Sequence, residues 1–124
     1  MEQMQSDYSS YFQTLKTNKT NLFADSDQLM KDCMQMFFDG YNGHLERIEQ
    51  AIERKDFKTI KEAVHKFKGS LKLFSDESLI HLCKTLENSA LDQNVNDIPV
   101  IYEKLSSEVN VLYGAMQEFN RTEL

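Results

Sequence analysis

The sequence contains few residues that interrupt helices. One proline and four glycines are spread over 124 residues, and tryptophan is absent. Residue types that favour helices, such as Leu, Met, Lys, Glu and Gln, are plentiful, while runs of β-branched residues are few. We therefore expect an all-α fold, and the length suits one compact domain.

Long apolar stretches and paired cysteines are also missing. No segment approaches the ~20 apolar residues that cross a bilayer, and the first residues lack the basic start and apolar core of a signal peptide. We expect a cytoplasmic protein that does not enter a membrane. Cys33 and Cys83 lie on predicted apolar helix faces and do not form a CxxC pair, so we expect buried thiols rather than a disulfide.

Several kinds of site are excluded by composition and spacing. The formal net charge of −6 argues against general nucleic-acid binding. No glycine-rich nucleotide loop is present, so we expect no autokinase activity. No two histidines lie three or four residues apart, so we expect no metal and no other cofactor. Ser70 projects about 140° away from His65 on a helix, which does not suit a hydrolytic triad.

Apolar residues recur at helical spacing in four segments. Capping residues at 25–27, at Asp56 and at Ser75 with its two acidic neighbours mark three of the starts, and Pro99 falls in the first turn of the last segment. Four helices with one apolar face each and short connections bury those faces best as an antiparallel four-helix bundle. The segments run from Asp27 to about Lys55, from Asp56 to Phe74, from Ser75 to Ala90 and from Ile98 to Phe119.

The first two dozen residues lie outside the four segments of the predicted bundle. Apolar residues from Met1 to Leu15 keep helical spacing, which predicts an additional N-terminal helix before a loop at 17–21. We divide the chain into this helix and loop, 1–24, and the bundle, 25–124. Packing across the open end of the bundle is the favoured place for the apolar face of the N-terminal helix, with self-association, a partner surface or disorder as alternatives.

His65 is the most informative residue of the predicted helices. At about 100° per residue, it lies about 150° from the apolar stripe of its helix, so its imidazole is predicted to point to solvent. His44 falls on an apolar helix side, and we interpret it as a core-edge histidine with a satisfied ring nitrogen. His81 is interpreted as a surface residue. Within roughly 60° of His65 lie Lys58, Lys61, Lys68, Gly69 and Lys72.

The lysines around His65 (Lys58, Lys61, Lys68 and Lys72) form a basic ridge on the helix surface. Gly69 distinguishes this ridge from an ordinary charged surface. A glycine inside a helix costs roughly 1 kcal/mol against alanine, and packing does not require one at an exposed position. A gap one turn from His65 would let another protein's backbone approach the imidazole, while Lys68 and Lys72 flank an incoming anion. Such an imidazole suits the acceptance of a phosphoryl group.

The hexapeptide His65-Lys-Phe-Lys68-Gly69-Ser70 resembles the signature of histidine-containing phosphotransfer (HPt) domains. In that family the motif His-x-hydrophobic-Lys-Gly-Ser/Ala lies on the second helix of a four-helix bundle. The resemblance covers about Asp27 to Phe119. Flanking residues that fit it are Ala63-Val64, Leu79, Leu82-Cys83 and Leu86-Glu87.

The resemblance implies a function in two-component signalling. It implies that His65 takes a phosphoryl group from a receiver-domain aspartate and passes it to another receiver, that Lys68 contacts the phosphoryl group, and that Gly69 gives clearance. The partners would be receivers of response regulators or hybrid histidine kinases, with Mg²⁺ on the receiver and Lys58, Lys61, Lys66 and Lys72 as docking residues. We expect a monomer. The alternative is a helical adaptor or inhibitor that binds through the same face without phosphate.

Overall fold

Every regular element among the described residues is an α-helix. The computed structural model describes the backbone of residues 2–124 and the side chains from Tyr8 onward. The helices are α1 (Glu2–Asn21), α2 (Asp27–Glu53), α3 (Phe57–Leu71), α4 (Glu77–Leu91) and α5 (Asp97–Glu123). Among the described residues, no helix is long and apolar enough to span a membrane.

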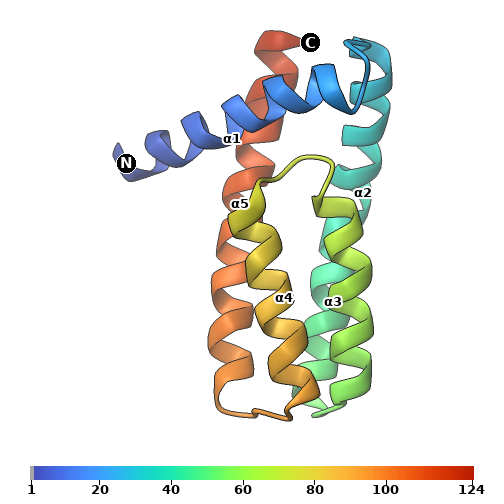
Figure 1. The fold of residues 1–124 in the computed structure, drawn as a ribbon, viewed down its shortest axis with the longest axis vertical. Coiled ribbons are helices and arrows are strands. Elements are labelled where there is room, and N and C mark those ends of the chain that lie inside the picture. Colours follow the sequence, from blue (N-terminus) through green and yellow to red (C-terminus); the bar gives the residue numbers. More distant parts are fainter. Residues whose placement is uncertain (1) are drawn as a thin grey trace.

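Helices α2 to α5 form an antiparallel four-helix bundle, and α1 lies across one of its ends (Figure 1). Consecutive bundle helices pack against each other, and α2 and α5 close the ring. The two longer helices, α2 and α5, extend beyond α3 and α4 toward the end that α1 crosses. The predicted bundle with an additional N-terminal helix is therefore confirmed.

The helix starts follow from their capping residues. The side chains of Ser26 and Asp56 accept hydrogen bonds from backbone N–H groups three residues on, at 3.1 and 3.2 Å, and so begin α2 and α3. The prediction of Ser75 as the next cap is wrong. Asp76 caps α4, and the Ser75 hydroxyl instead donates to the Leu71 carbonyl at 2.8 Å, where α3 ends. Phe74, expected within the helix, lies just beyond it.

The core is built around aromatic rings between α2 and α3. Phe37 contacts the rings of Tyr41, Phe67 and Phe74, with centroids 5.6, 6.3 and 5.7 Å apart. Both cysteines are free: Cys83 is buried, and Cys33 is partly exposed. The core also fixes how α3 is rotated about its own axis, because the helix must bury its apolar residues. These are Ile60, Ala63, Val64, Phe67 and Leu71.

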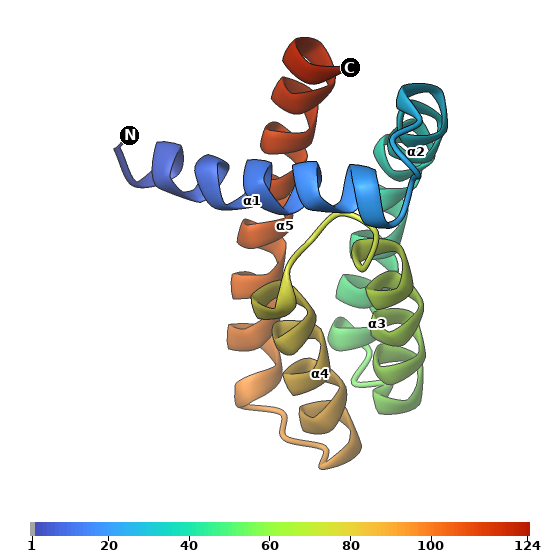
Figure 2. The same ribbon diagram turned by 45° about the horizontal axis from the view of Figure 1, so that its top comes forward.

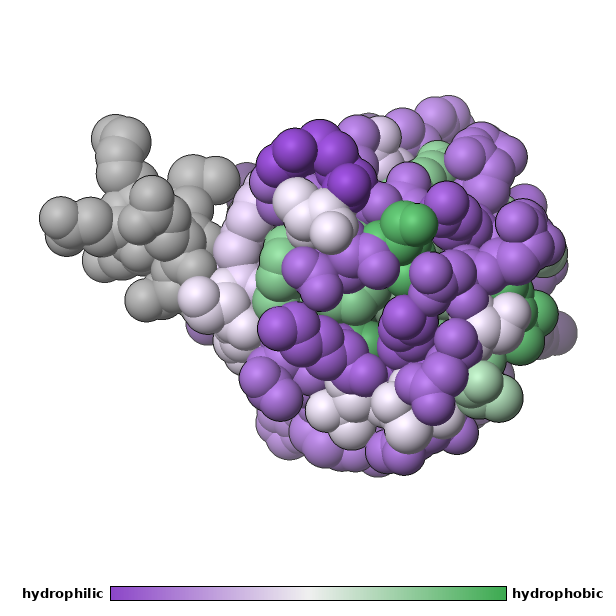
Figure 3. All heavy atoms as spheres, turned by 90° about the horizontal axis from the view of Figure 1, so that it is seen from above, coloured by the Kyte–Doolittle hydropathy of each residue, from purple (hydrophilic) through white to green (hydrophobic). Residues whose placement is uncertain are grey.

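Helix α1 packs on α5 across the end of the bundle, as the favoured interpretation of its apolar face predicted (Figure 2). Tyr11 is buried, and its hydroxyl donates to Glu108 at 2.8 Å, while the Phe12 and Phe119 rings meet edge to face at 5.5 Å. At Gly114 a Cβ would collide with the tip of the Tyr8 side chain, so the glycine leaves room for the Tyr8 hydroxyl against α5. Seen from this end, the surface is mostly hydrophilic with apolar patches between (Figure 3).

The predicted loop at 17–21 is wrong, because α1 continues to Asn21. The Asn18 side chain donates to the Leu73 carbonyl at 3.0 Å, and the Asn18 carbonyl accepts from the backbone of Leu22. The chain turns later, where Ala24 and Asp25 adopt φ of 52° and 60°. The polar side chain of Asn18 therefore does not end α1. It binds α1 to the segment that follows α3.

Candidate functional site: the His65 face of α3

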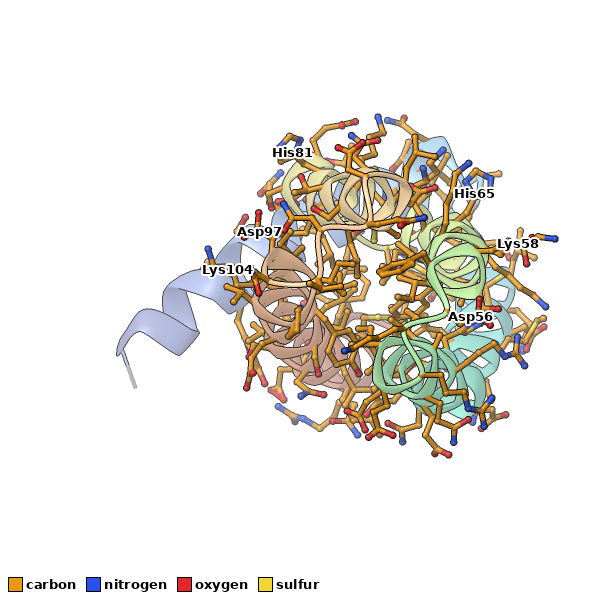
Figure 4. All side chains as sticks on the ribbon, turned by 90° about the horizontal axis from the view of Figure 1, so that it is seen from below. Asp56, Lys58, His65, His81, Asp97 and Lys104 are labelled. Atoms are coloured by element: carbon orange, nitrogen blue, oxygen red, sulfur yellow. The ribbon has the colours of Figure 1, made fainter. Side chains whose placement is uncertain are left out.

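His65 lies on the outer face of α3, as predicted. Its side chain is 72% exposed. The view along the bundle shows it at the edge of the molecule, on the same side as Lys58 (Figure 4). The buried stripe of α3 holds this orientation, because turning the helix would expose Phe67 and Val64, which are fully buried.

A carboxylate from α4 lies beside the imidazole. Glu87 Oε2 is 3.0 Å from His65 Nδ1, and Glu87 Oε1 is 2.6 Å from Lys68 Nζ. The Glu87 and Lys68 side chains are each 11% exposed, so the ion pair is largely buried beneath the exposed ring. One carboxylate thus contacts two residues of the motif.

One sequence-based expectation about this cluster is wrong, and one contact in it was not predicted. Lys68 was expected on the exposed ridge, but it points toward α4 and is buried with Glu87. A helical projection of α3 alone places Lys68 near His65 and cannot show that α4 covers that side. The sequence indicates Glu87 only through the family resemblance, because its contact with His65 joins residues 22 positions apart.

The contacts of Glu87 determine the hydrogen-bonding state of the imidazole. Paired with the Lys68 ammonium, Glu87 is a carboxylate that can only accept hydrogen bonds. The hydrogen-bond contact at Nδ1 therefore places the proton of the neutral ring on that nitrogen. Nε2 is then left with its lone pair. Nearby, burial and the charge of Glu87 raise the pKa of the Cys83 thiol to about 12, so Cys83 is a neutral neighbour.

Gly69 occupies open space on the exposed side of α3. A Cβ built there meets no other atom within 4 Å, apart from the helix's own backbone. Packing does not require the glycine, in agreement with the sequence argument. One turn from His65, the space that a Cβ at position 69 would occupy is therefore open.

The remaining ridge lysines are exposed as expected. An open hollow beside the imidazole is lined by Lys58, Lys61, Glu62, His65 and Glu87. Lys66 and Lys72 also lie on the surface of this helix region. The face around His65 is therefore rich in positive charge, although the chain carries a net charge of −6.

The other candidate histidines lie in different surroundings. The His44 ring stacks on Phe67 with centroids 5.1 Å apart, and burial together with Lys66 and Arg47 lowers the pKa of His44. The expected hydrogen bond to its ring is not found in the part of the chain that the structure describes, so stacking is what holds it. His81 is exposed on α4, away from His65 and Lys58 (Figure 4). The described side chains form no cluster of potential metal ligands.

Comparison with known proteins identifies the family. The family model described as "Hpt domain" matches residues 32–117, which covers most of the chain and includes the His65 cluster. The protein therefore belongs to the Hpt domain family. A search of the curated proteins found no significant match, and neither did a search of the solved structures.

Family membership gives the protein a phosphotransfer role in two-component signalling. Hpt domains are phosphoryl carriers rather than enzymes, and they interact with receiver domains. The matched region begins within α2, so α1 lies outside it.

Proposed function

We propose that this protein is a phosphorelay intermediate in which His65 accepts a phosphoryl group from a receiver-domain aspartate and passes it to a second receiver. The observation that carries the proposal is the state of the imidazole. Its ring is 72% exposed, and Glu87 holds the Nδ1 side at 3.0 Å. Nε2 is the nitrogen that remains as an outward nucleophile.

The transfer step uses this arrangement directly. The Nε2 lone pair attacks the phosphorus of the aspartyl phosphate, the Nε2–P bond forms, and the aspartyl O–P bond breaks to leave the receiver's carboxylate. The Nδ1 proton stays on the ring, next to Glu87, so no general base is required. Mg²⁺ is expected on the receiver and would stabilise charge on the phosphoryl oxygens. The Hpt chain contributes a nucleophile and its orientation.

Two further features support docking at this face. The open space at Gly69 gives room for a receiver loop close to the imidazole. The exposed lysines Lys58, Lys61, Lys66 and Lys72 complement the acidic cluster expected at a receiver's phosphorylation site. We assign these four lysines to partner binding and Gly69 to clearance.

The test is phosphoryl transfer from a phosphorylated receiver domain to the full chain. Wild type should become labelled with acid-labile phosphate, and His65→Gln should remain unlabelled. His81→Gln, which removes an exposed histidine elsewhere on the bundle, should accept phosphate at the wild-type rate. Label that persists in His65→Gln would refute the assignment, and binding of receivers without transfer to wild type would favour the adaptor function.

A further inference from the structure

One carboxylate, Glu87, has two possible cationic partners at this site. In the unphosphorylated domain its partner is Lys68, whose Nζ lies 2.6 Å from Oε1, while the neutral His65 ring lies 3.0 Å from Oε2. Because Lys68 and Glu87 are both largely buried, each requires a counter-charge. Lys68 is therefore not available to a phosphoryl group unless Glu87 acquires another cation.

Phosphorylation of His65, which the proposed function requires, supplies that cation. When Nε2 bonds to phosphorus and the proton stays on Nδ1, the ring becomes an N-phosphorylated imidazolium. The new positive charge lies at the N–H group that faces Glu87 Oε2. The phosphoryl oxygens, with up to two negative charges, lie on the opposite, outward side of the ring.

We propose that phosphorylation exchanges the partner of Glu87. The imidazolium replaces Lys68 as the counter-ion of the carboxylate, and Lys68 moves outward to pair with the phosphoryl oxygens. The Glu87 carboxylate and the Lys68 ammonium each have a partner of opposite charge both before and after loading. Glu87 thus holds the Lys68 ammonium beside His65 in the unphosphorylated protein, and Lys68 becomes available to the phosphoryl group after transfer.

The position of Lys68 makes the exchange feasible. It follows His65 by three residues on the same helix, and residues at this spacing are neighbours on the helix surface. The Lys68 ammonium and the His65 ring already meet on one carboxylate, so the movement needs a change of side-chain torsions and no movement of α3 or α4. Without it, the Lys68 ammonium and the imidazolium would share the single negative charge of Glu87, and Lys68 would not contact the phosphoryl dianion.

The exchange can be observed in the full wild-type chain by NMR. Phosphoramidate, a small phosphoryl donor, loads the chain without a receiver. The resting protein should show a scalar coupling across the hydrogen bond from Lys68 Nζ to the Glu87 carboxyl carbon. After loading, that coupling should disappear, and a coupling between Lys68 Nζ and phosphorus should appear, while the Nδ1 proton signal of His65 persists.

Titration of the loaded chains gives a second measurement. If Lys68 pairs with the phosphoryl group, Lys68→Gln should move the ³¹P titration midpoint to higher pH, because a nearby cation favours the dianion. Lys104→Gln, on the far side of the bundle, should leave the midpoint unchanged. Should Lys68→Gln fail to fold with Glu87 unpaired, the double variant Lys68→Gln/Glu87→Gln removes both buried charges and is compared with Glu87→Gln instead.

The outcomes separate this inference from the proposed function. Loading at His65 with the Lys68–Glu87 coupling intact and an unchanged midpoint in the Lys68 variant would overturn the exchange alone. Loading at another residue, or no loading at all, would count against the proposed function and would also remove the basis of the exchange. Loss of the coupling between Lys68 Nζ and Glu87, together with a new coupling between Lys68 Nζ and phosphorus, supports both the exchange and the proposed function.

Discussion

At the scale of single residues, the proposed function gives Gly69 the role of clearance for a receiver domain. Because its surroundings are open, Gly69→Ala should raise the free energy of unfolding by up to about 1 kcal/mol from helix propensity. Gly69→Gln should also fold, yet its side chain would fill the space that a receiver loop must enter. We expect Gly69→Gln to lower the rate of phosphotransfer by roughly tenfold or more.

The measurement for Gly69 combines thermal unfolding with the transfer rate from a phosphorylated receiver. Gly43→Ala on α2, where a Cβ also meets nothing within 4 Å, is the control for the gain in helix propensity. A folded Gly69→Gln protein that transfers at the wild-type rate would show that the glycine is not a clearance position.

His44 gives a prediction about pH. Its pKa is lowered in the folded state by burial, Lys66 and Arg47, so the unfolded chain binds this proton more readily. The neutral ring therefore contributes stability that is complete above its ordinary pKa of about 6.5 and is lost as the pH falls from that value through the lower pKa of the folded state. The free energy of unfolding of wild type should decrease more steeply on acidification below about pH 7 than that of His44→Gln.

Chemical denaturation at a series of pH values tests this prediction. His81→Gln, which replaces an exposed histidine, should keep the wild-type slope. Parallel curves for wild type and His44→Gln would mean that the stacked ring of His44 does not contribute to the pH dependence.

At the scale of elements, the helices could be predicted because their signals are local. The apolar stripe of α3 and the cap at Asp56 both lie within one segment of sequence, and the structure confirms them. The loop expected at 17–21 failed because its polar residues acquire a partner that is distant in sequence, the Leu73 carbonyl. Local polarity did not distinguish a loop from a helix end that another element satisfies.

The site was only half predictable for the same reason. The outward direction of His65 and the open position of Gly69 follow from the periodicity of α3. The burial of Lys68 and the role of Glu87 depend on how α3 and α4 rotate against each other. Periodicity fixes which face of a helix is buried, but it does not identify which polar residues at the margin of that face meet across the interface.

The start of α3 should be sensitive to its cap. The Asp56 carboxylate accepts from the Thr59 N–H at 3.2 Å and from the Thr59 hydroxyl at 2.7 Å, and these bonds lower the pKa of Asp56. Asp56→Ala should reduce the free energy of unfolding by about 1 kcal/mol. Glu62→Ala, an exposed acid further along α3, should change it much less. Equal effects of the two variants on urea denaturation would contradict a capping role.

At the scale of the whole molecule, charge is unevenly distributed. Four lysines lie within α3 and Lys72 follows it, in a chain whose net charge is −6. Attraction between this face and an acidic receiver should therefore be local and sensitive to salt. We expect Lys66→Gln/Lys72→Gln to weaken receiver binding at low salt and to reduce the salt dependence of the dissociation constant.

Binding titrations at several salt concentrations test this docking prediction. Lys104→Gln, on the far side of the bundle, should retain both the affinity and the salt dependence of wild type. Unfolding stability should be unaffected in both cases, since exposed lysines typically contribute ~0–1 kcal/mol. Identical salt dependence in the double variant and wild type would exclude these two lysines from the docking surface.

The placement of α1 has a consequence for local unfolding of the chain. Its contacts with α5, such as the hydrogen bond from Tyr11 to Glu108, join residues 97 positions apart, whereas consecutive bundle helices are joined by short connections. Local contacts form first and long loops close last. We expect α1 to behave as a separate cooperative unit whose amide hydrogens exchange with solvent faster than those of α2 to α5. Gly114→Ala, whose Cβ would collide with the Tyr8 side chain, should accelerate amide exchange in α1 alone. Gly40→Ala, where a Cβ meets nothing within 4 Å, should leave exchange in α1 unchanged. Uniform protection across all five helices would show that α1 and the bundle unfold as one unit.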